Sequence, residues 1–225
     1  MSVSILYYKV TPDKISSTQV SELINIWSAE LPSQKQQQIA QLRQQEDQLL
    51  SLAGLQLLKL GMANFSDCPF SLDQLQFPQQ RKPFFSDDID FNISHSGNIA
   101  CCAIADHIQI GIDLELQREV KSATMNKYLP QNAYSSQNSG KESQVEFFSI
   151  WTKNEAIIKA ANHGSIYNMS EIALDSKGGK YQQHYWYTYP IKIESNNPKQ
   201  AYTCHIASSE KLTDSALQVT QIFHL

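Results

Sequence analysis

Several features that mark common classes of protein are missing from the sequence. Its four cysteines include no CxxC pair, so zinc binding and dithiol chemistry have little support. No run approaches the roughly 20 consecutive apolar residues that a membrane-spanning helix needs. The first residues carry neither the basic segment nor the long apolar segment of a signal peptide. These absences predict a cytoplasmic protein without a membrane partner.

An excess of charge of either sign is also missing. The 225 residues include 18 basic and 22 acidic side chains, a formal net charge of -4, so nucleic acid is not expected as a partner. Hydrophobic residues make up 41% of the chain, an ordinary globular composition that argues against extensive disorder. The length fits one large domain or two small ones.

Periodic patterns predict an α+β protein. The first elements are expected to be a strand over 4–10, a helix over 33–60 ended by Gly61, and a hairpin of 98–104 with 107–114. The later ones are a loop over 120–140, a helix over 146–161, and strands over 185–193, 200–207 and 216–223. This order predicts two α+β halves, residues 1–110 and 111–225.

The sharpest local pattern is the run Gly111-Ile112-Asp113-Leu114-Glu115. Because side chains alternate along a strand, Asp113 and Glu115 share one face while Ile112 and Leu114 enter the core. Two carboxylates about 7 Å apart on one face repel each other unless a cation lies between them. Mg²⁺ takes such oxygen ligands together with substrate phosphates and water. The alternative is a strand whose exposed face happens to be acidic.

A second pattern lies in the later predicted helix. Trp151, Glu155 and Lys159 are each four residues apart, so they line one stripe of the helix. The stripe offers an aromatic wall, a carboxylate and an ammonium group. Taken alone, Glu155 and Lys159 are better explained as a solvent-exposed ion pair worth a few tenths of a kcal/mol.

The third pattern is Phe91-Asn92-Ile93-Ser94-His95-Ser96-Gly97, a strand that ends in small hydroxyls, an imidazole and a glycine. Such groups together donate several hydrogen bonds to phosphate oxygens, although a lone histidine in a turn is more often structural. Upstream, Arg81-Lys82-Pro83-Phe84 places two cations before a rigid turn, which equally fits a solvated loop.

The order of these motifs, KP, FNISHS, GIDLE and WxxxEAxxK, resembles the signature set of the Sfp-type 4′-phosphopantetheinyl transferases. The resemblance implies two similar α+β subdomains that form a pseudodimer, with coenzyme A and Mg²⁺ at their interface. It implies transfer of 4′-phosphopantetheine from coenzyme A to a serine of an apo acyl, peptidyl or polyketide carrier protein, with release of 3′,5′-ADP. A monomer is expected, because one chain supplies both halves of the site.

The same resemblance assigns roles to individual residues. For the metal it implies Asp113 and Glu115, with Glu155 either a third ligand or the general base that takes the proton of the carrier serine. In catalysis Lys159, facing the pyrophosphate, would act beside Asp113 and Glu155. The residues implied in coenzyme A binding are Lys82, Pro83, Ser94, His95 and Lys159.

The chain departs from the family's pattern at three places. Asn154 stands where the family has a lysine, and we expect the neighbouring Lys153 to take over its contact with the coenzyme A phosphates. Around Leu50 the chain lacks an arginine that meets the 3′-phosphate, and Asn162-His163-Gly164-Ser165 replaces a glycine-rich turn. These departures leave open a relative that binds coenzyme A or carrier protein without transfer. An unrelated α+β protein would require all four motifs to be coincidental.

Overall fold

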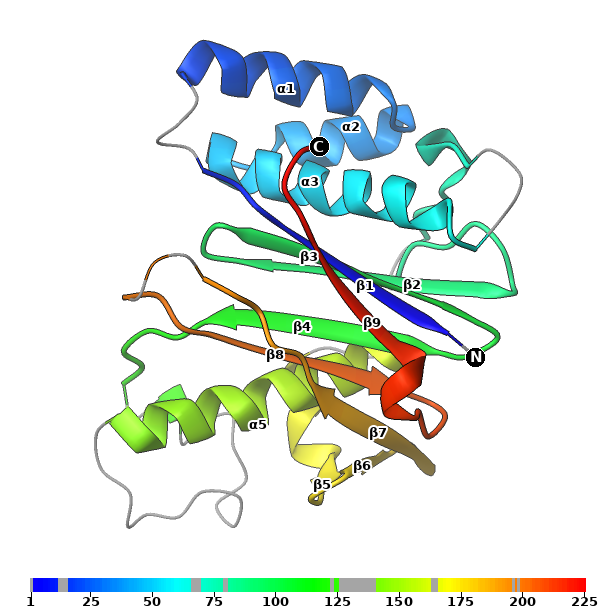
Figure 1. Ribbon diagram of the computed structural model, residues 1–225, viewed down its shortest axis with the longest axis vertical. Coiled ribbons are helices and arrows are strands. Elements are labelled where there is room, and N and C mark those ends of the chain that lie inside the picture. The colour runs from blue at the N-terminus through cyan, green and yellow to red at the C-terminus, as the bar shows by residue number, and fades with distance from the viewer. Residues whose placement is uncertain are drawn as a thin grey trace.

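The computed structural model describes residues 2–11, 16–65, 70–78, 81–121, 124–125, 141–162, 166–195, 197 and 199–225, with residues 141 and 166–168 described by their backbone alone. It is a mixed α+β protein with two sheets, which confirms the predicted fold class (Figure 1). The α-helices are α1 (Ser17–Ala29), α2 (Ser33–Ala40), α3 (Gln45–Met62) and α5 (Lys141–Ala160). Within the described residues, the short 3₁₀ helices are η2 (Leu72–Gln74), η3 (Ile166–Glu171) and η4 (Asp214–Ala216). Among the described residues, no helix combines the length and apolar content that crossing a membrane requires.

The first sheet has the strand order β2-β3-β1-β9. Its strands are β1 (Val3–Lys9), β2 (Ile89–Ser96), β3 (Ile99–Asp106) and β9 (Leu217–Ile222). β1 pairs antiparallel with β3 and parallel with β9, so the last strand of the chain returns to the first sheet. β3 is buried on both faces, which explains its almost continuous run of small and apolar residues.

The second sheet is antiparallel, with the strand order β4-β8-β7-β6-β5. Its strands are β4 (Ile110–Leu116), β5 (Ala173–Leu174), β6 (Gly178–Tyr181), β7 (His184–Pro190) and β8 (Tyr202–Ser208). The two sheets pack on each other, and the helices lie outside them (Figure 1). The first three helices cover the first sheet and α5 covers the second.

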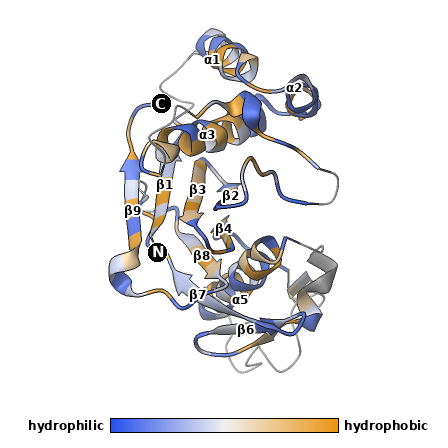
Figure 2. Ribbon diagram, turned by 90° about the vertical axis from the view of Figure 1, so that its right-hand side faces the viewer, coloured by the Kyte–Doolittle hydropathy of each residue, from blue (hydrophilic) through white to orange (hydrophobic). Residues whose placement is uncertain are grey.

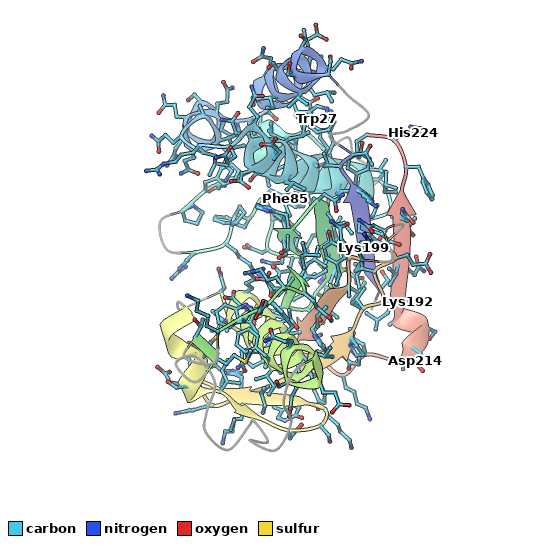
Figure 3. All side chains as sticks on the ribbon, turned by 90° about the vertical axis from the view of Figure 1, so that its left-hand side faces the viewer. Trp27, Phe85, Lys192, Lys199, Asp214 and His224 are labelled. Carbon is cyan, nitrogen blue, oxygen red and sulfur yellow. The ribbon has the colours of Figure 1, made fainter. Side chains whose placement is uncertain are left out.

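The apolar core follows from the alternation of side chains along the strands. On β1, Val3 and Ile5 face the second sheet while Leu6 faces the helices. Figure 2 shows the largely apolar α3 lying against β1 and β3. Trp27 and Phe85, labelled in Figure 3, belong to the same apolar cluster as α3. The junction between the sheets is therefore filled by apolar side chains.

Two expectations about local structure are wrong. Consecutive strands β3 and β4 do not form a hairpin, because β3 is already paired on both edges and β4 belongs to the other sheet. The helix expected over 33–60 is two helices, α2 and α3, and Gly61 lies inside α3 instead of ending it. A Cβ on Gly61 would lie 2.5 Å from a methyl of Ile104 and 2.8 Å from one of Leu6, so this glycine allows α3 to pack on the sheet.

The sequence interpretation missed α1, although a signal for it exists. Ser16 and Gln19 form a capping box, in which each side chain accepts a hydrogen bond from the other residue's backbone N–H. Most of the predicted loop over 120–140 lies outside the described residues. The division at residue 110 and the pseudodimer relation of the halves stay predictions. Strand β9, residues 217–222, belongs to the second half of the chain but completes the sheet of the first half.

Candidate functional site

The site lies where the edges of the two sheets meet. β2 ends the first sheet, β4 ends the second, and α5 packs across β4 (Figure 1). Between them is a cavity of about 290 Å³. It is lined by Ile93, Ser94, His95, Asp113, Leu114, Glu115, Glu155 and Lys159. The structure thus brings residues of three separate sequence motifs together around one cavity.

Gly111 explains how α5 comes so close to β4. A Cβ at this position would lie 2.2 Å from the carbonyl oxygen of Ala156 and 2.4 Å from the backbone nitrogen of Ala160. Only a residue without a side chain fits against the backbone of the helix here. The first residue of the GIDLE run therefore lets α5 present Glu155 and Lys159 to the carboxylates of β4.

We expect Gly111→Ala to lower both stability and activity. The added methyl must push α5 away from β4, a change that typically costs about 1–3 kcal/mol or more, and it displaces Glu155 and Lys159. The matched control is Gly61→Ala, whose methyl meets the ends of flexible side chains on the far side of the first sheet. Urea denaturation and transfer activity per folded molecule measure both effects. Equal activity of the two folded variants would contradict this role of Gly111.

Asp113 is the most enclosed of the acidic residues, with 4% of its surface exposed. Its Oδ1 atom accepts hydrogen bonds from the Lys159 ammonium at 2.5 Å and from the Ser94 hydroxyl at 3.2 Å. Its Oδ2 atom is buried and has no hydrogen-bond partner among the described residues. A buried carboxylate oxygen without a partner is unusual, and it marks a place where a cation or a donor is expected.

Glu115 lies two residues further along β4 and on the same face, as the alternation predicted. Its Oε2 atom accepts hydrogen bonds from the Ser96 hydroxyl at 2.9 Å and from the Arg118 guanidinium at 3.1 Å. The guanidinium also lies over the Phe148 ring, 5.8 Å from its centroid. Glu115 is therefore held from two sides at the more open end of the cavity.

Glu155 and Lys159 do not form the surface ion pair that their spacing alone favoured. Lys159 pairs with Asp113 on β4. Burial acts to lower the pKa of Lys159, but the carboxylates of Asp113 and Glu155 outweigh it and raise that pKa above its ordinary value. Burial raises the pKa of Glu155 to about 7, with Lys159 opposing the rise and Asp113 and Glu115 adding to it. The site thus holds a permanent cation and a carboxyl group that titrates near neutral pH.

His95 lies at the rim of the cavity and faces α3. Its Nε2 atom is 3.3 Å from the hydroxyl of Ser51. Desolvation lowers the pKa of His95 below its ordinary value although part of the residue is exposed; the charges of Asp47 and Glu115 oppose this shift and that of Lys159 adds to it. The ring is therefore neutral at pH 7, with one nitrogen able to donate and the other able to accept a hydrogen bond.

Two of the predicted site residues, Lys82 and Pro83, lie outside this cavity. The Lys82 ammonium binds the Asp90 carboxylate and, at 2.9 Å, the carbonyl of Ile110. Lys82 lines a second, larger cavity of about 610 Å³, in which Asp90 and two further aspartates accompany Arg81 and Lys82. Pro83 lines neither of the two cavities described. The role of Lys82 and Pro83 in coenzyme A binding stays a prediction.

Lys153 and Asn154 also lie outside the cavity. Lys153 is half-buried, and its charge adds to the effect of burial in lowering the pKa of His205 to about 4. Asn154 is 1% exposed, and neither polar atom of its amide has a hydrogen-bond partner among the described residues. The contact of Lys153 with coenzyme A stays a prediction. Of the turn at 162–165, only Asn162 lies within the described residues; its side chain accepts a hydrogen bond from the Lys82 backbone at 2.8 Å.

Ser96, Arg118 and Ser51 contact the site, and the family resemblance assigned none of them a role. For Ser96 a signal existed, because it is two residues after Ser94 on the same strand and therefore shares its face. Arg118 lies beyond the end of β4, and Ser51 comes from α3, far away in the sequence. No local pattern brings either of them to the cavity.

Comparison with known proteins agrees with the motif order. A family model described as "4'-phosphopantetheinyl transferase, N-terminal" matches residues 18–107. The 4'-phosphopantetheinyl transferase gsp of Aneurinibacillus migulanus is 28% identical over 232 residues, which cover 99% of this chain and 94% of the relative. The 4'-phosphopantetheinyl transferase HetI of a Nostoc species is 39% identical over 89 residues, 37% of each chain. These matches support the 4′-phosphopantetheinyl transferase family that the order of the motifs predicted.

Proposed function

We propose that this protein uses Mg²⁺ to transfer 4′-phosphopantetheine from coenzyme A to a serine of an apo carrier protein, and releases 3′,5′-ADP. One observation carries the proposal. Asp113, Glu115, Glu155 and Lys159 come from two elements and meet around one cavity. Three carboxylates and an ammonium group are the groups that a divalent cation and a pyrophosphate need around them.

The residues present fit a magnesium ion. No group of three or more His, Cys, Asp or Glu side chains converges as a metal site within the described part of the chain. Mg²⁺ does not need one, because it commonly binds one or two carboxylates and completes its shell with phosphates and water. The unpartnered Oδ2 atom of Asp113 and the neighbouring Glu115 carboxylate would hold the ion. When bound, the ion would supply positive charge that stabilises the negative charge developing on the 3′,5′-ADP leaving group.

The chain's own groups have distinct tasks in this reaction. The pKa of Glu155, about 7, suits a general base, which takes the proton of the carrier serine as its oxygen attacks the β-phosphorus of coenzyme A. The bond from that phosphorus to the bridging oxygen of the pyrophosphate breaks, and 3′,5′-ADP leaves with the electron pair. Lys159, held by Asp113, keeps a positive charge where negative charge develops.

The test is to incubate the protein with coenzyme A, Mg²⁺ and a panel of apo carrier proteins. Mass spectrometry should show a carrier heavier by one phosphopantetheine group, and chelation of the metal with EDTA should prevent the gain. A protein that binds coenzyme A in calorimetry but modifies none of the carriers would contradict transfer and favour the relative that binds without transferring. Transfer that persists in EDTA would contradict the metal requirement alone.

We expect His95→Ala to raise the KM for coenzyme A about tenfold and to change kcat much less. A hydrogen bond to a phosphate that does not react contributes equally to ground-state and transition-state binding. Ser51→Ala is the matched control, because it removes the partner of His95 on α3 and leaves the imidazole in place. Steady-state kinetics at varied coenzyme A concentration measure both. Equal losses in kcat and kcat/KM would place His95 at the transition state.

A further inference from the structure

Strands β2 and β4 lie next to each other without a backbone ladder between them. Each is the last strand of its own sheet. Instead, alternate backbone N–H groups of β4 donate to side chains of β2. The four pairs are Ile110 to Asp90 at 2.8 Å, Ile112 to Asn92 at 3.0 Å, Leu114 to Ser94 at 3.2 Å, and Leu116 to Ser96 at 3.0 Å.

This arrangement follows from the geometry of strands. Alternate residues of β4 direct their N–H groups toward β2, and the others direct theirs toward β8. A backbone donor at a buried edge needs a partner, because leaving it unpaired is costly. Four polar side chains at alternate positions of β2 supply the acceptors that a neighbouring strand would otherwise supply. We call this set, Asp90, Asn92, Ser94 and Ser96 with their four donors, the side-chain ladder.

Two rungs of the side-chain ladder do more than join the strands. The Ser94 hydroxyl accepts from Leu114 and donates to Asp113 at 3.2 Å. In the same way, the Ser96 hydroxyl accepts from Leu116 and donates to Glu115 at 2.9 Å. Each serine therefore binds a backbone N–H of β4 and the carboxylate of the residue just before it.

The hydroxyl of Ser94 has no hydrogen bond left to give. It has one proton and two lone pairs. The proton goes to Asp113, and the lone pairs accept from the Leu114 backbone and, at 3.3 Å, from the Lys159 ammonium. The resemblance to the family implied that Ser94 contacts a phosphate of coenzyme A. The geometry instead commits its donor to a carboxylate.

We propose that Ser94 and Ser96 are positioning residues, which fix the rotation and the separation of the Asp113 and Glu115 carboxylates for a divalent cation. This inference rests on the proposed function. A hydroxyl that donates to one oxygen of a carboxylate stops the group from rotating and leaves the other oxygen for the ion. At Asp113 that other oxygen is the buried atom without a partner. Groups that orient metal ligands typically change metal affinity about 10- to 100-fold when they are removed.

The experiment uses Ser96, because Ser94 also contacts Lys159. Mn²⁺ is titrated into the full chain at saturating coenzyme A, and the free ion is followed by electron paramagnetic resonance against a blank of coenzyme A alone. We expect Ser96→Ala to weaken Mn²⁺ binding about tenfold. Ser96→Thr keeps the hydroxyl and should bind Mn²⁺ like the wild type. Valine has nearly the same shape as threonine but no hydroxyl, so Ser96→Val should bind Mn²⁺ as weakly as Ser96→Ala.

Asn92→Ala is the control for a purely structural role. It removes a rung of the side-chain ladder that the structure does not connect to a carboxylate of the site. We expect it to lower Tm in circular dichroism and to change the affinity for Mn²⁺ less than twofold. If Ser96→Thr and Ser96→Val bind Mn²⁺ equally, or if Asn92→Ala weakens binding as much as Ser96→Ala, the positioning role is wrong. If the wild type binds no Mn²⁺ beyond the blank, the metal of the proposed function is wrong as well.

Discussion

Replacing Asp113 by asparagine is expected to lower the rate of phosphopantetheine transfer about 10³-fold. The change removes one negative charge and the unpartnered oxygen that we assign to the metal, and several kcal/mol of charge stabilisation in the transition state depend on them. The rate is measured with coenzyme A, Mg²⁺ and an excess of apo carrier protein. If Asp113→Asn keeps most of its Mg²⁺-dependent activity, the metal assignment is wrong.

Stability has to be followed in the same experiment. Asp113 is buried and paired with Lys159, so its removal affects the fold as well as the site. Removing one partner of a buried ion pair typically costs about 3–5 kcal/mol, so Asp113→Ala should unfold more easily in urea. The double variant Asp113→Asn with Lys159→Met removes both charges. It should regain stability without regaining activity, which separates damage to the site from damage to the fold.

Replacing Glu155 by glutamine is expected to lower kcat about 10²- to 10⁴-fold at pH 8, because a general base contributes about that much. Glutamine has nearly the same size and cannot accept the proton of the serine. The small activity that remains should lose the rise with pH that the carboxyl group produces in the wild type near pH 7. A variant with an unchanged kcat and pH profile would exclude Glu155 as the base.

The same substitution should stabilise the protein in the absence of metal. Between its ordinary pKa of 4.5 and its pKa of about 7 in the fold, Glu155 keeps a proton that the unfolded chain releases. This contribution to stability is therefore complete at low pH and is lost as the pH rises through 7. In EDTA at pH 8, the free energy of unfolding of Glu155→Gln should exceed that of the wild type by about 1–3 kcal/mol, a value reduced for the partial exposure of the site. At pH 5 the two free energies of unfolding should be nearly the same.

His205 and His95 change the free energy of unfolding with pH in the direction opposite to Glu155. Burial lowers the pKa of both, to about 4 for His205, so the unfolded chain binds protons below pH 6.5 that the folded chain does not. Their contribution to stability is lost as the pH falls. Because both proteins carry both histidines, this term is nearly the same in each and largely cancels from the difference. If the difference in free energy of unfolding between Glu155→Gln and the wild type does not grow with pH, the raised pKa of Glu155 is contradicted.

Alternation and helical spacing were enough to predict much of the site. They placed Asp113 with Glu115 on one strand face, and Glu155 with Lys159 on one helix face. What they could not predict is the partner of each group across elements. Local spacing paired Lys159 with Glu155, whereas the packing of α5 on Gly111 turns its ammonium to Asp113. Such a contact depends on the distance between two backbones, which no short motif encodes.

The same limit explains the errors in the fold. Two apolar runs separated by Ala105-Asp106 fit a hairpin locally. The competing pairs are remote, because β3 is already paired with β1 and β2, and β4 finds its partner in β8. His107, at φ 58°, takes the left-handed conformation where the chain leaves one sheet for the other.

Strand β9 pairs with β1, which is synthesised much earlier. The Tyr7 hydroxyl on β1 donates to the Gln221 side chain on β9, 214 residues away. During synthesis β1 therefore keeps one edge unpaired until residues 217–222 have left the ribosome, and an unpaired edge promotes aggregation. Since residues of the second half complete the sheet of the first, and the two sheets share one apolar core, we expect them to unfold in one cooperative transition. A fragment that ends at residue 110 should be insoluble or only partly folded when it is expressed alone.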